Sequence, residues 1–257
     1  MRFLHVGDIV GKPGRDKLIR EIPKLRSELK LDFVTANAEN SAAGSGINLS
    51  IYKELIGCGI DCLTMGDHAF KRKEGMTVLE TQDRIIRPAN YPSQAPGKGY
   101  CVFDLNMGVR CAVINLLGRV FMQPIDSPMT AIDKILRQLP DDVKVIVVDF
   151  HAEATSDKQI MGRYLDGRVT AVLGTHTHVA TADEQIYPKG TAFQCDVGMT
   201  GPMLSIIGRR IDHVTETTLT ARPTSFDVAE EDVRIHGTIV DFDPWSGKAT
   251  AIERLVA

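Results

Sequence analysis

The chain has 257 residues, 30 Lys and Arg against 33 Asp and Glu, a formal net charge of −3 and 43% hydrophobic residues. This balance is ordinary for a soluble globular protein, and it argues against a stable nucleic-acid partner or an anionic membrane as partner. No run of 18 apolar residues predicts a membrane span, and residues 1–11 lack the features of a secretion signal. The five cysteines match no disulfide framework, so we expect reduced thiols and a cytoplasmic protein.

The first part of the chain predicts alternating strands and helices. In chain order they are a strand at 3–7, a helix at 12–30, a strand at 32–37, a helix at 49–58 and a strand at 62–65. The first helix has leucine and isoleucine at intervals of three to four residues, and Pro23 is expected to kink it. A β-α-β-α-β order predicts a parallel sheet with helices packed on it.

The rest of the chain predicts a hairpin, two more helices and many strands. The hairpin covers 100–105 and 109–117, and the segments after it are a helix at 128–139, a strand at 143–149, a helix at 156–164 and a strand at 169–173. Beyond residue 186 strands are predicted around Phe193 and at 214–219, 233–242 and 249–255. We therefore expect one α/β domain, residues 1–257, with two stacked mixed β-sheets flanked by helices.

Polar side chains follow five of these predicted strands. They are Asp8, Glu39 with Asn40, Asp67 with His68, His151, and His176 with His178. Because the carboxyl ends of parallel strands meet at one edge of a sheet, we expect these side chains to lie together there. The other histidines, His5, His213 and His236, lie in or beside strands and are expected to be structural.

The residue types at these strand ends are those that bind transition metals. Carboxylate oxygen and neutral imidazole nitrogen suit Mn, Fe, Co and Zn. A carboxylate placed between two ions about 3.5–4 Å apart could bridge them, as in two-metal hydrolytic sites. Glycines at 7, 44, 46, 66 and 174 are expected to permit tight turns around the site.

In these blocks the sequence resembles the calcineurin-like metallophosphoesterases. The segments AEN followed by AAGSGI, then GTHTHV and DVGMTGP, resemble the YmdB-like branch over essentially the whole chain. The resemblance implies the sandwich fold of that superfamily and the activity of a 2′,3′-cyclic-nucleotide 2′-phosphodiesterase.

The resemblance also implies a role for each residue. Asp8, Asn40 and His178 would hold one metal ion, Asp67, His151 and His176 a second, and Glu39 would bridge the two. His68 would face the substrate as a general acid or phosphate stabiliser. Iron or manganese would be the metals.

The chain departs from the pattern of the superfamily at two places. Asp8 is followed by Ile9 and Val10, so the Asp-x-His start of the wider superfamily is missing, as it is in the YmdB-like branch. The third block usually reads Gly-Asn-His, but here it reads Gly-Asp67-His68. Asp67 would add a third carboxylate, which should hold divalent metal more tightly.

The expected function is hydrolysis of small phosphoesters, 2′,3′-cyclic nucleotides foremost, by attack of a hydroxide that bridges two metal ions. Two alternatives stay open. One is a metal-dependent amidase or nuclease, and the other is a regulatory metal-binding protein with weak or no catalysis. The sequence leaves the oligomeric state open, a homo-oligomer included.

Overall fold

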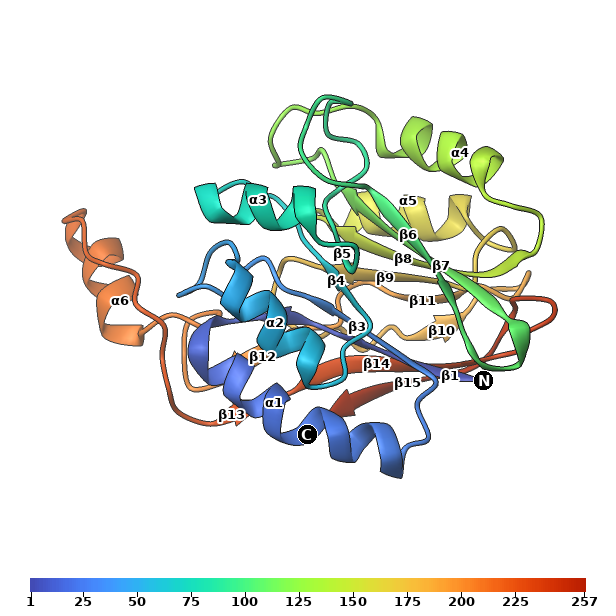
Figure 1. The fold of residues 1–257 in the computed structure, drawn as a ribbon. Helices are drawn as coiled ribbons and strands as arrows, with labels where there is room; N and C mark the ends of the chain where they lie inside the picture. The colour runs from blue at the N-terminus through green and yellow to red at the C-terminus, as the bar shows by residue number, and fades with distance from the viewer.

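The computed structural model describes residues 1–257, and its strands form two six-stranded sheets and one three-stranded sheet (Figure 1). From edge to edge, the first sheet contains β15 (Ala249–Val256), β14 (His236–Phe242), β1 (Arg2–Val6), β3 (Phe33–Asn37), β4 (Cys62–Thr64) and β5 (Ile85–Ile86). The second contains β10 (Gln185–Ile186), β11 (Ala192–Gln194), β9 (Ala171–Thr175), β8 (Val143–His151), β7 (Arg110–Leu117) and β6 (Tyr100–Asp104). The small sheet contains β13 (Val233–Arg234), β12 (Met199–Pro202) and β2 (Asp8–Ile9).

Both large sheets mix parallel and antiparallel pairs. In the first, β1 runs parallel to β3 and antiparallel to β14, so a strand near the C-terminus completes a sheet begun at the N-terminus. In the second, β7, β8 and β9 are parallel, and β6 and β7 form the antiparallel hairpin that the sequence predicts. The prediction of two stacked mixed sheets flanked by helices is confirmed.

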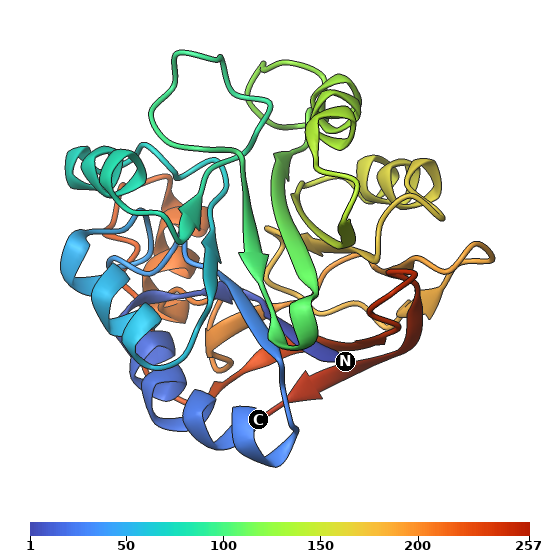
Figure 2. The same cartoon turned by 45° about the vertical axis from the view of Figure 1, so that its right-hand side comes forward.

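Helices cover the two outer faces of the sandwich. They are α1 (Gly11–Glu28), α2 (Leu49–Gly57) and α3 (Lys73–Thr81) on the first sheet, and α4 (Pro128–Gln138) and α5 (Thr155–Tyr164) on the second (Figure 2). Helix α1 continues through Pro23 as one element. A short 3-10 turn, η1 (Asn106–Gly108), joins β6 to β7.

The alternation of side chains along β8 shows how this strand packs against the layers on both of its faces. Val145 and Val147 pack with Phe3 and Phe33 in the cluster between the sheets, whereas Ile146 packs outward with α4 and α5. Successive side chains of a strand point to opposite faces, so both faces of β8 are apolar. This explains the nearly continuous apolar run that marks the strand in the sequence.

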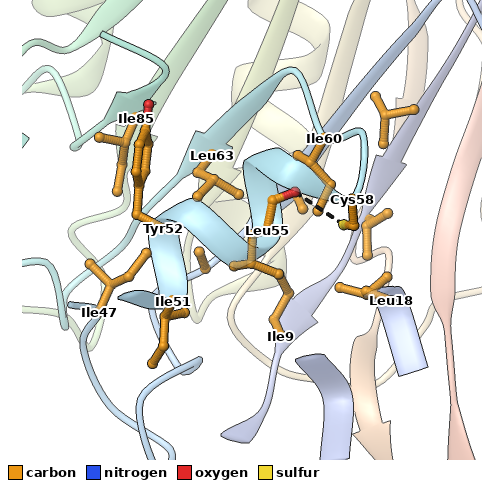
Figure 3. Packing of buried hydrophobic residues seen from close by; sticks show 14 of the residues in the cluster. Ile9, Leu18, Ile47, Ile51, Tyr52, Leu55, Cys58, Ile60, Leu63 and Ile85 are labelled. Carbon is orange, nitrogen blue, oxygen red and sulfur yellow. Dashed lines mark hydrogen bonds between the residues drawn. The ribbon is translucent and has the colours of Figure 1, made fainter. Parts of the chain in front are cut away.

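The cluster on the outer face of the first sheet anchors α1 and α2. Figure 3 shows Leu18 of α1 and Leu55 of α2 gathered with Leu63 of β4. Leu18 and Leu55 are fully buried, and burying a leucine side chain contributes roughly 1.5–3 kcal/mol. The loops that follow β3 and β4 are thereby carried on a firmly packed layer.

The prediction of a strand at 214–219 is wrong, because these residues lie in helix α6 (Ile211–Thr220). His213, which was expected in or beside a strand, also lies in this helix. Valine and threonine favour strands only where a neighbouring strand can pair with them, and α6 projects from the body with no buried residue (Figure 1). Helix α3 and the two-residue strand β5 were not predicted from the sequence.

None of the helices combines the length and the apolar character needed to cross a membrane.

Candidate metal centre

The eight predicted site residues lie together where the two large sheets meet. Asp8 begins β2 directly after β1, Glu39 and Asn40 follow β3, Asp67 and His68 follow β4, His151 ends β8, and His176 and His178 follow β9. The expectation of one sheet edge is therefore wrong in one respect. The strand ends belong to two sheets, since β1, β3 and β4 lie in the first sheet and β8 and β9 in the second.

One group of side chains converges closely enough to hold a cation. The ligand atoms of Glu39, Asp67, His151 and His176 all lie within 4.8 Å of one another. Nε2 of His151 is 3.3 Å from Oε1 of Glu39 and 3.3 Å from Oδ1 of Asp67. Nδ1 of His176 is 3.0 Å from the same His151 nitrogen. Two carboxylates and two imidazoles at these distances form a donor set suited to a divalent transition metal.

A second group lies beside the first. Nε2 of His178 is 3.8 Å from Oδ1 of Asp8 and 3.1 Å from Nδ2 of Asn40. The same Asn40 nitrogen is 3.2 Å from Oε1 of Glu39. Glu39 thus contacts residues of both groups, which is the position that a bridging carboxylate would need.

The charges of the site fit a bound cation. Oδ1 of Asp8 is buried and has no hydrogen-bond partner, an arrangement that is costly unless something positive compensates it. Burial raises the pKa of Asp8 to about 6, although His178 and His151 partly offset this. Burial would lower the pKa of His151, but the carboxylates of Glu39 and Asp67 raise it well above its usual value. Both pKa shifts favour proton uptake, as expected where clustered negative charge has no metal ion to balance it.

His68 lies at the rim of these groups. Its Nδ1 is 2.8 Å from Oδ1 of Asn40 and 3.2 Å from Oε1 of Glu39, and its backbone amide donates to Oε2 of Glu39 at 2.9 Å. The hydrogen bond to Glu39 raises the pKa of His68. The ring is thus held through Nδ1, and Nε2 remains free of hydrogen bonds, with Oδ2 of Asp67 3.8 Å away.

Glycines near the site serve close packing more than turns. A side chain at Gly66 would collide with Glu39 and His151, and one at Gly174 would collide with the carbonyl of Cys195. The prediction of a tight turn is wrong for Gly174, which lies within β9. Gly66 does begin a turn, in which the amide of Ala69 donates to the Gly66 carbonyl at 3.1 Å, and Gly44 and Gly46 have the positive φ of 87° and 76° that glycine permits. The left-handed backbone also occurs at His176 and His178, with φ of 102° and 65°. Such conformations persist in non-glycine residues only where the surroundings enforce them.

A buried hydrogen-bond chain orients His151. The Thr175 hydroxyl donates to Oδ1 of Asp149 at 2.6 Å and lies 2.9 Å from Nδ1 of His151. A hydroxyl has a single proton, so Nδ1 of His151 must be the donor to Thr175, which leaves Nε2, the nitrogen that faces Glu39, as the one able to bind a metal ion. Sequence reasoning missed Asp149, yet a lone carboxylate in the apolar run VKVIVVDFH was a readable signal.

Two further partners were also missed. Oε2 of Glu153 is 3.2 Å from Nε2 of His176, and the carbonyl of Ile207 accepts from Nδ1 of His178 at 2.9 Å. Each contacts the ring nitrogen away from the metal groups and so fixes the orientation of its imidazole. Glu153 lies two residues after His151 and could have been noticed, but nothing in the sequence points to a carbonyl at 207.

The chain has clear relatives of known sequence. A sequence profile for the family described as YmdB-like protein matches residues 4–255. The 2′,3′-cyclic-nucleotide 2′-phosphodiesterase of Bacillus subtilis (strain 168) is 44% identical over 256 residues, which is 100% of this chain and 97% of that protein.

Solved structures agree with these matches. A hypothetical protein from Thermus thermophilus superimposes with a TM-score of 0.94 at 40% identity, covering 100% of this chain and 99% of that one. A novel phosphatase from Mycoplasma pneumoniae also gives a TM-score of 0.94, at 31% identity, with coverage of 100% and 93%. Fold and relatives together define a metallophosphoesterase-type α/β sandwich. Within that class, the chain belongs to the YmdB-like protein family.

Proposed function

We propose that this protein is a two-metal phosphodiesterase that hydrolyses small phosphoesters, with 2′,3′-cyclic nucleotides as its substrates. The observation that carries the proposal is the group of Glu39, Asp67, His151 and His176, which is close enough to hold a cation, with Asp8, Asn40 and His178 beside it and Glu39 in contact with both sets. The name of the Bacillus subtilis relative supports the substrate class.

Each group would hold one metal ion. Asp8, Asn40 and His178 would bind the first, and Asp67, His151 and His176 the second, with Glu39 between them. Iron or manganese suits this set of oxygen and nitrogen donors, which contains no thiolate. Two such ions, when bound, would lower the pKa of an attacking water and offset charge on the phosphoryl oxygens.

The remaining chemistry falls to His68. Its Nδ1 is engaged by Asn40 and Glu39, so Nε2 is the nitrogen available to the substrate. A protonated Nε2 would donate to the leaving oxygen of the ester, and a positioned acid of this kind contributes about 10²–10⁴-fold to the rate. Glu39 holds this ring from the same carboxylate that lies between the metal groups, which couples the acid to the metal centre.

Two measurements test the proposal. Elemental analysis of protein purified without chelators should find about two transition-metal ions per chain, and fewer than one under metal-replete conditions would contradict it. Turnover of 2′,3′-cyclic AMP should exceed that of duplex DNA by a wide margin, because the net charge of −3 offers no general attraction for a polyanion. Robust cleavage of duplex DNA would support the nuclease alternative. Metal binding without turnover of bis-p-nitrophenyl phosphate would support the regulatory alternative.

The proposal includes a cytoplasmic location and a single domain. All five cysteines are free and buried, as expected in a reducing cytoplasm. The pairing of β14 with β1 and the shared cluster between the sheets support one domain spanning 1–257. A single unfolding transition, coincident by fluorescence and circular dichroism, would agree with this.

A further inference from the structure

A buried ion pair lies behind the histidine loop and outside the proposed ligand set. Lys158, on the inner side of α5, places its Nζ 2.7 Å from Oδ2 of Asp196, which lies between β11 and β12. Both side chains are almost fully buried, at 2% and 1% exposed. Burying two charges is expensive, and such a pair contributes little net stability compared with apolar residues of the same size. The pair is therefore better explained by the other residues that it holds in place.

The carboxylate of Asp196 is bonded to the residue between the two site histidines. Oδ2 accepts from the backbone amide of Thr177 at 3.0 Å and from its hydroxyl at 2.7 Å. Oδ1 accepts from the amide of Gly198 at 2.9 Å. Lys158 thus compensates the charge of a carboxylate that ties residue 177 to the segment after β11.

Anchoring Thr177 constrains both of its neighbours. His176 and His178 each adopt a left-handed backbone that a non-glycine residue rarely takes. Their imidazoles reach different groups: that of His176 contacts His151 and that of His178 contacts Asp8 and Asn40. If Thr177 were released, the two flanking residues could relax toward ordinary backbone angles, and the rings would leave these positions.

We propose that the Lys158–Asp196 pair is a positioning device that holds Thr177, and through it places His176 in one metal group and His178 in the other. The inference rests on the proposed metal-dependent function, because it assigns the pair a role in metal binding. Lys158 and Asp196 touch neither metal nor substrate and act only through the loop.

The test compares metal affinity with stability in the full-length protein. Asp196→Asn keeps the size of the side chain but removes its negative charge. That charge pairs with Lys158 and strengthens the hydrogen bond from the Thr177 hydroxyl. After chelator treatment, titration with Mn²⁺ should show affinity about 10–100-fold weaker than in the wild type, as is usual when an outer partner of metal ligands is lost. Asp61→Asn is the matched control, because Asp61 also binds an arginine and a backbone amide, those of Arg26 and Val34, but lies at the amino end of β4 away from the site. It should lower the melting temperature without changing Mn²⁺ affinity.

A second substitution tests the contact itself. Thr177→Val preserves the branched shape and removes only the hydroxyl bond to Asp196, so it should weaken Mn²⁺ binding less than Asp196→Asn does, while Thr177→Ser should largely restore it. If Asp196→Asn fails to fold, the Mn²⁺ affinity of Thr177→Val alone tests the inference. Wild-type Mn²⁺ affinity in Thr177→Val and in a folded Asp196→Asn variant would overturn the inference and leave the pair as a stabilising contact only.

The inference and the proposed function can fail separately. If the wild type binds Mn²⁺ but turns over no phosphodiester, the proposed function fails and the affinity comparison still decides the inference. If the wild type binds no Mn²⁺, the proposed function fails, and side-chain ¹⁵N signals of the metal-free protein decide. Changed signals of His176 and His178 in Asp196→Asn would then support the positioning role, and unchanged signals would overturn it.

Discussion

The histidine loop after β9 and helix α6 both adopt a backbone that their residues do not locally prefer, but for opposite reasons. His176 and His178 are held in the left-handed region by buried contacts from distant parts of the chain, among them Asp8, Asp196 and His151. Helix α6 has no buried residue and relies on bonds within its own neighbourhood. The hydroxyls of Thr218 and Thr220 donate to carbonyls four residues earlier, for example.

The difference teaches where changes in the sequence should matter. Around the histidine loop, each contact fixes several others, so a small substitution should weaken metal binding and lower turnover. Around α6, contacts are local and open to solvent, so a substitution should change little beyond the helix itself. The following substitutions test this contrast.

The largest effect is expected at Glu39. Glu39→Gln removes the charge that contacts His151, His68 and Asn40 and lies between the two metal groups. Metal content should fall from about two ions to one or none, and kcat/KM should drop by about 10⁴-fold or more, since each ion supplies several kcal/mol of transition-state stabilisation and about 1.4 kcal/mol is a factor of ten. Elemental analysis and steady-state kinetics measure both. Two retained ions with near-normal turnover would remove Glu39 from the centre of the site.

His68→Ala should separate acid catalysis from metal binding. Metal content should stay nearly intact, while turnover of 2′,3′-cyclic AMP should fall by about 10²–10⁴-fold. Activated nitrophenyl esters should be affected far less, because their leaving group needs no proton. Kinetics on both substrates together with elemental analysis are the measurements. Equal losses on both substrates, or loss of metal, would contradict the assignment of His68 as a general acid.

Asp67→Asn should give a smaller effect that isolates charge. The two side chains are nearly the same size, so packing should be preserved and only one negative charge near His151 and His176 is lost. Affinity for the second metal ion should weaken by about tenfold, equivalent to about 1.4 kcal/mol. With less negative charge beside the attacking water, the pKa of that water should fall. The rise in rate that follows its deprotonation should therefore move to lower pH. Metal titration and pH–rate profiles measure the two effects. If neither changes, Asp67 is not a ligand.

The smallest effect is expected on α6. Leu219 is 78% exposed, so Leu219→Ala should change the free energy of unfolding by no more than about 0.5 kcal/mol and leave metal content and turnover unchanged. Leu55→Ala is the matched control, because Leu55 lies fully buried on the inner face of α2 and its truncation should cost about 2–5 kcal/mol. Chemical denaturation measures the free energy of unfolding of Leu219→Ala and Leu55→Ala. A large loss of stability in Leu219→Ala would show that α6 is covered in solution, for instance by another chain.

The sequence by itself determined most of the framework. The strands β1, β3 and β8 could be predicted because their apolar character is a local property, and the helices α1, α2, α4 and α5 because their spacing is local too. All eight candidate site residues could be found for a related reason. A polar side chain directly after an apolar strand stands out in the sequence, and the strand carries it to a shared end of the fold.

Only the tertiary structure decided how these parts meet. That five strand ends come from two different sheets depends on which strands pair, since β1, β3 and β4 join one sheet and β8 and β9 the other. The first sheet also takes in β14, whose pairing with β1 joins residues more than 200 positions apart. The tie of Asp196 to Thr177 and Lys158, and the left-handed backbone of His176 and His178, depend on packing between α5, β9 and the segment after β11. In α6 the preference of valine and threonine for strands had no neighbouring strand to satisfy it, so a helix formed. Local preference is readable from residues close in sequence, whereas strand pairing, buried ion pairs and strained backbone arise from contacts that exist only after the chain has folded.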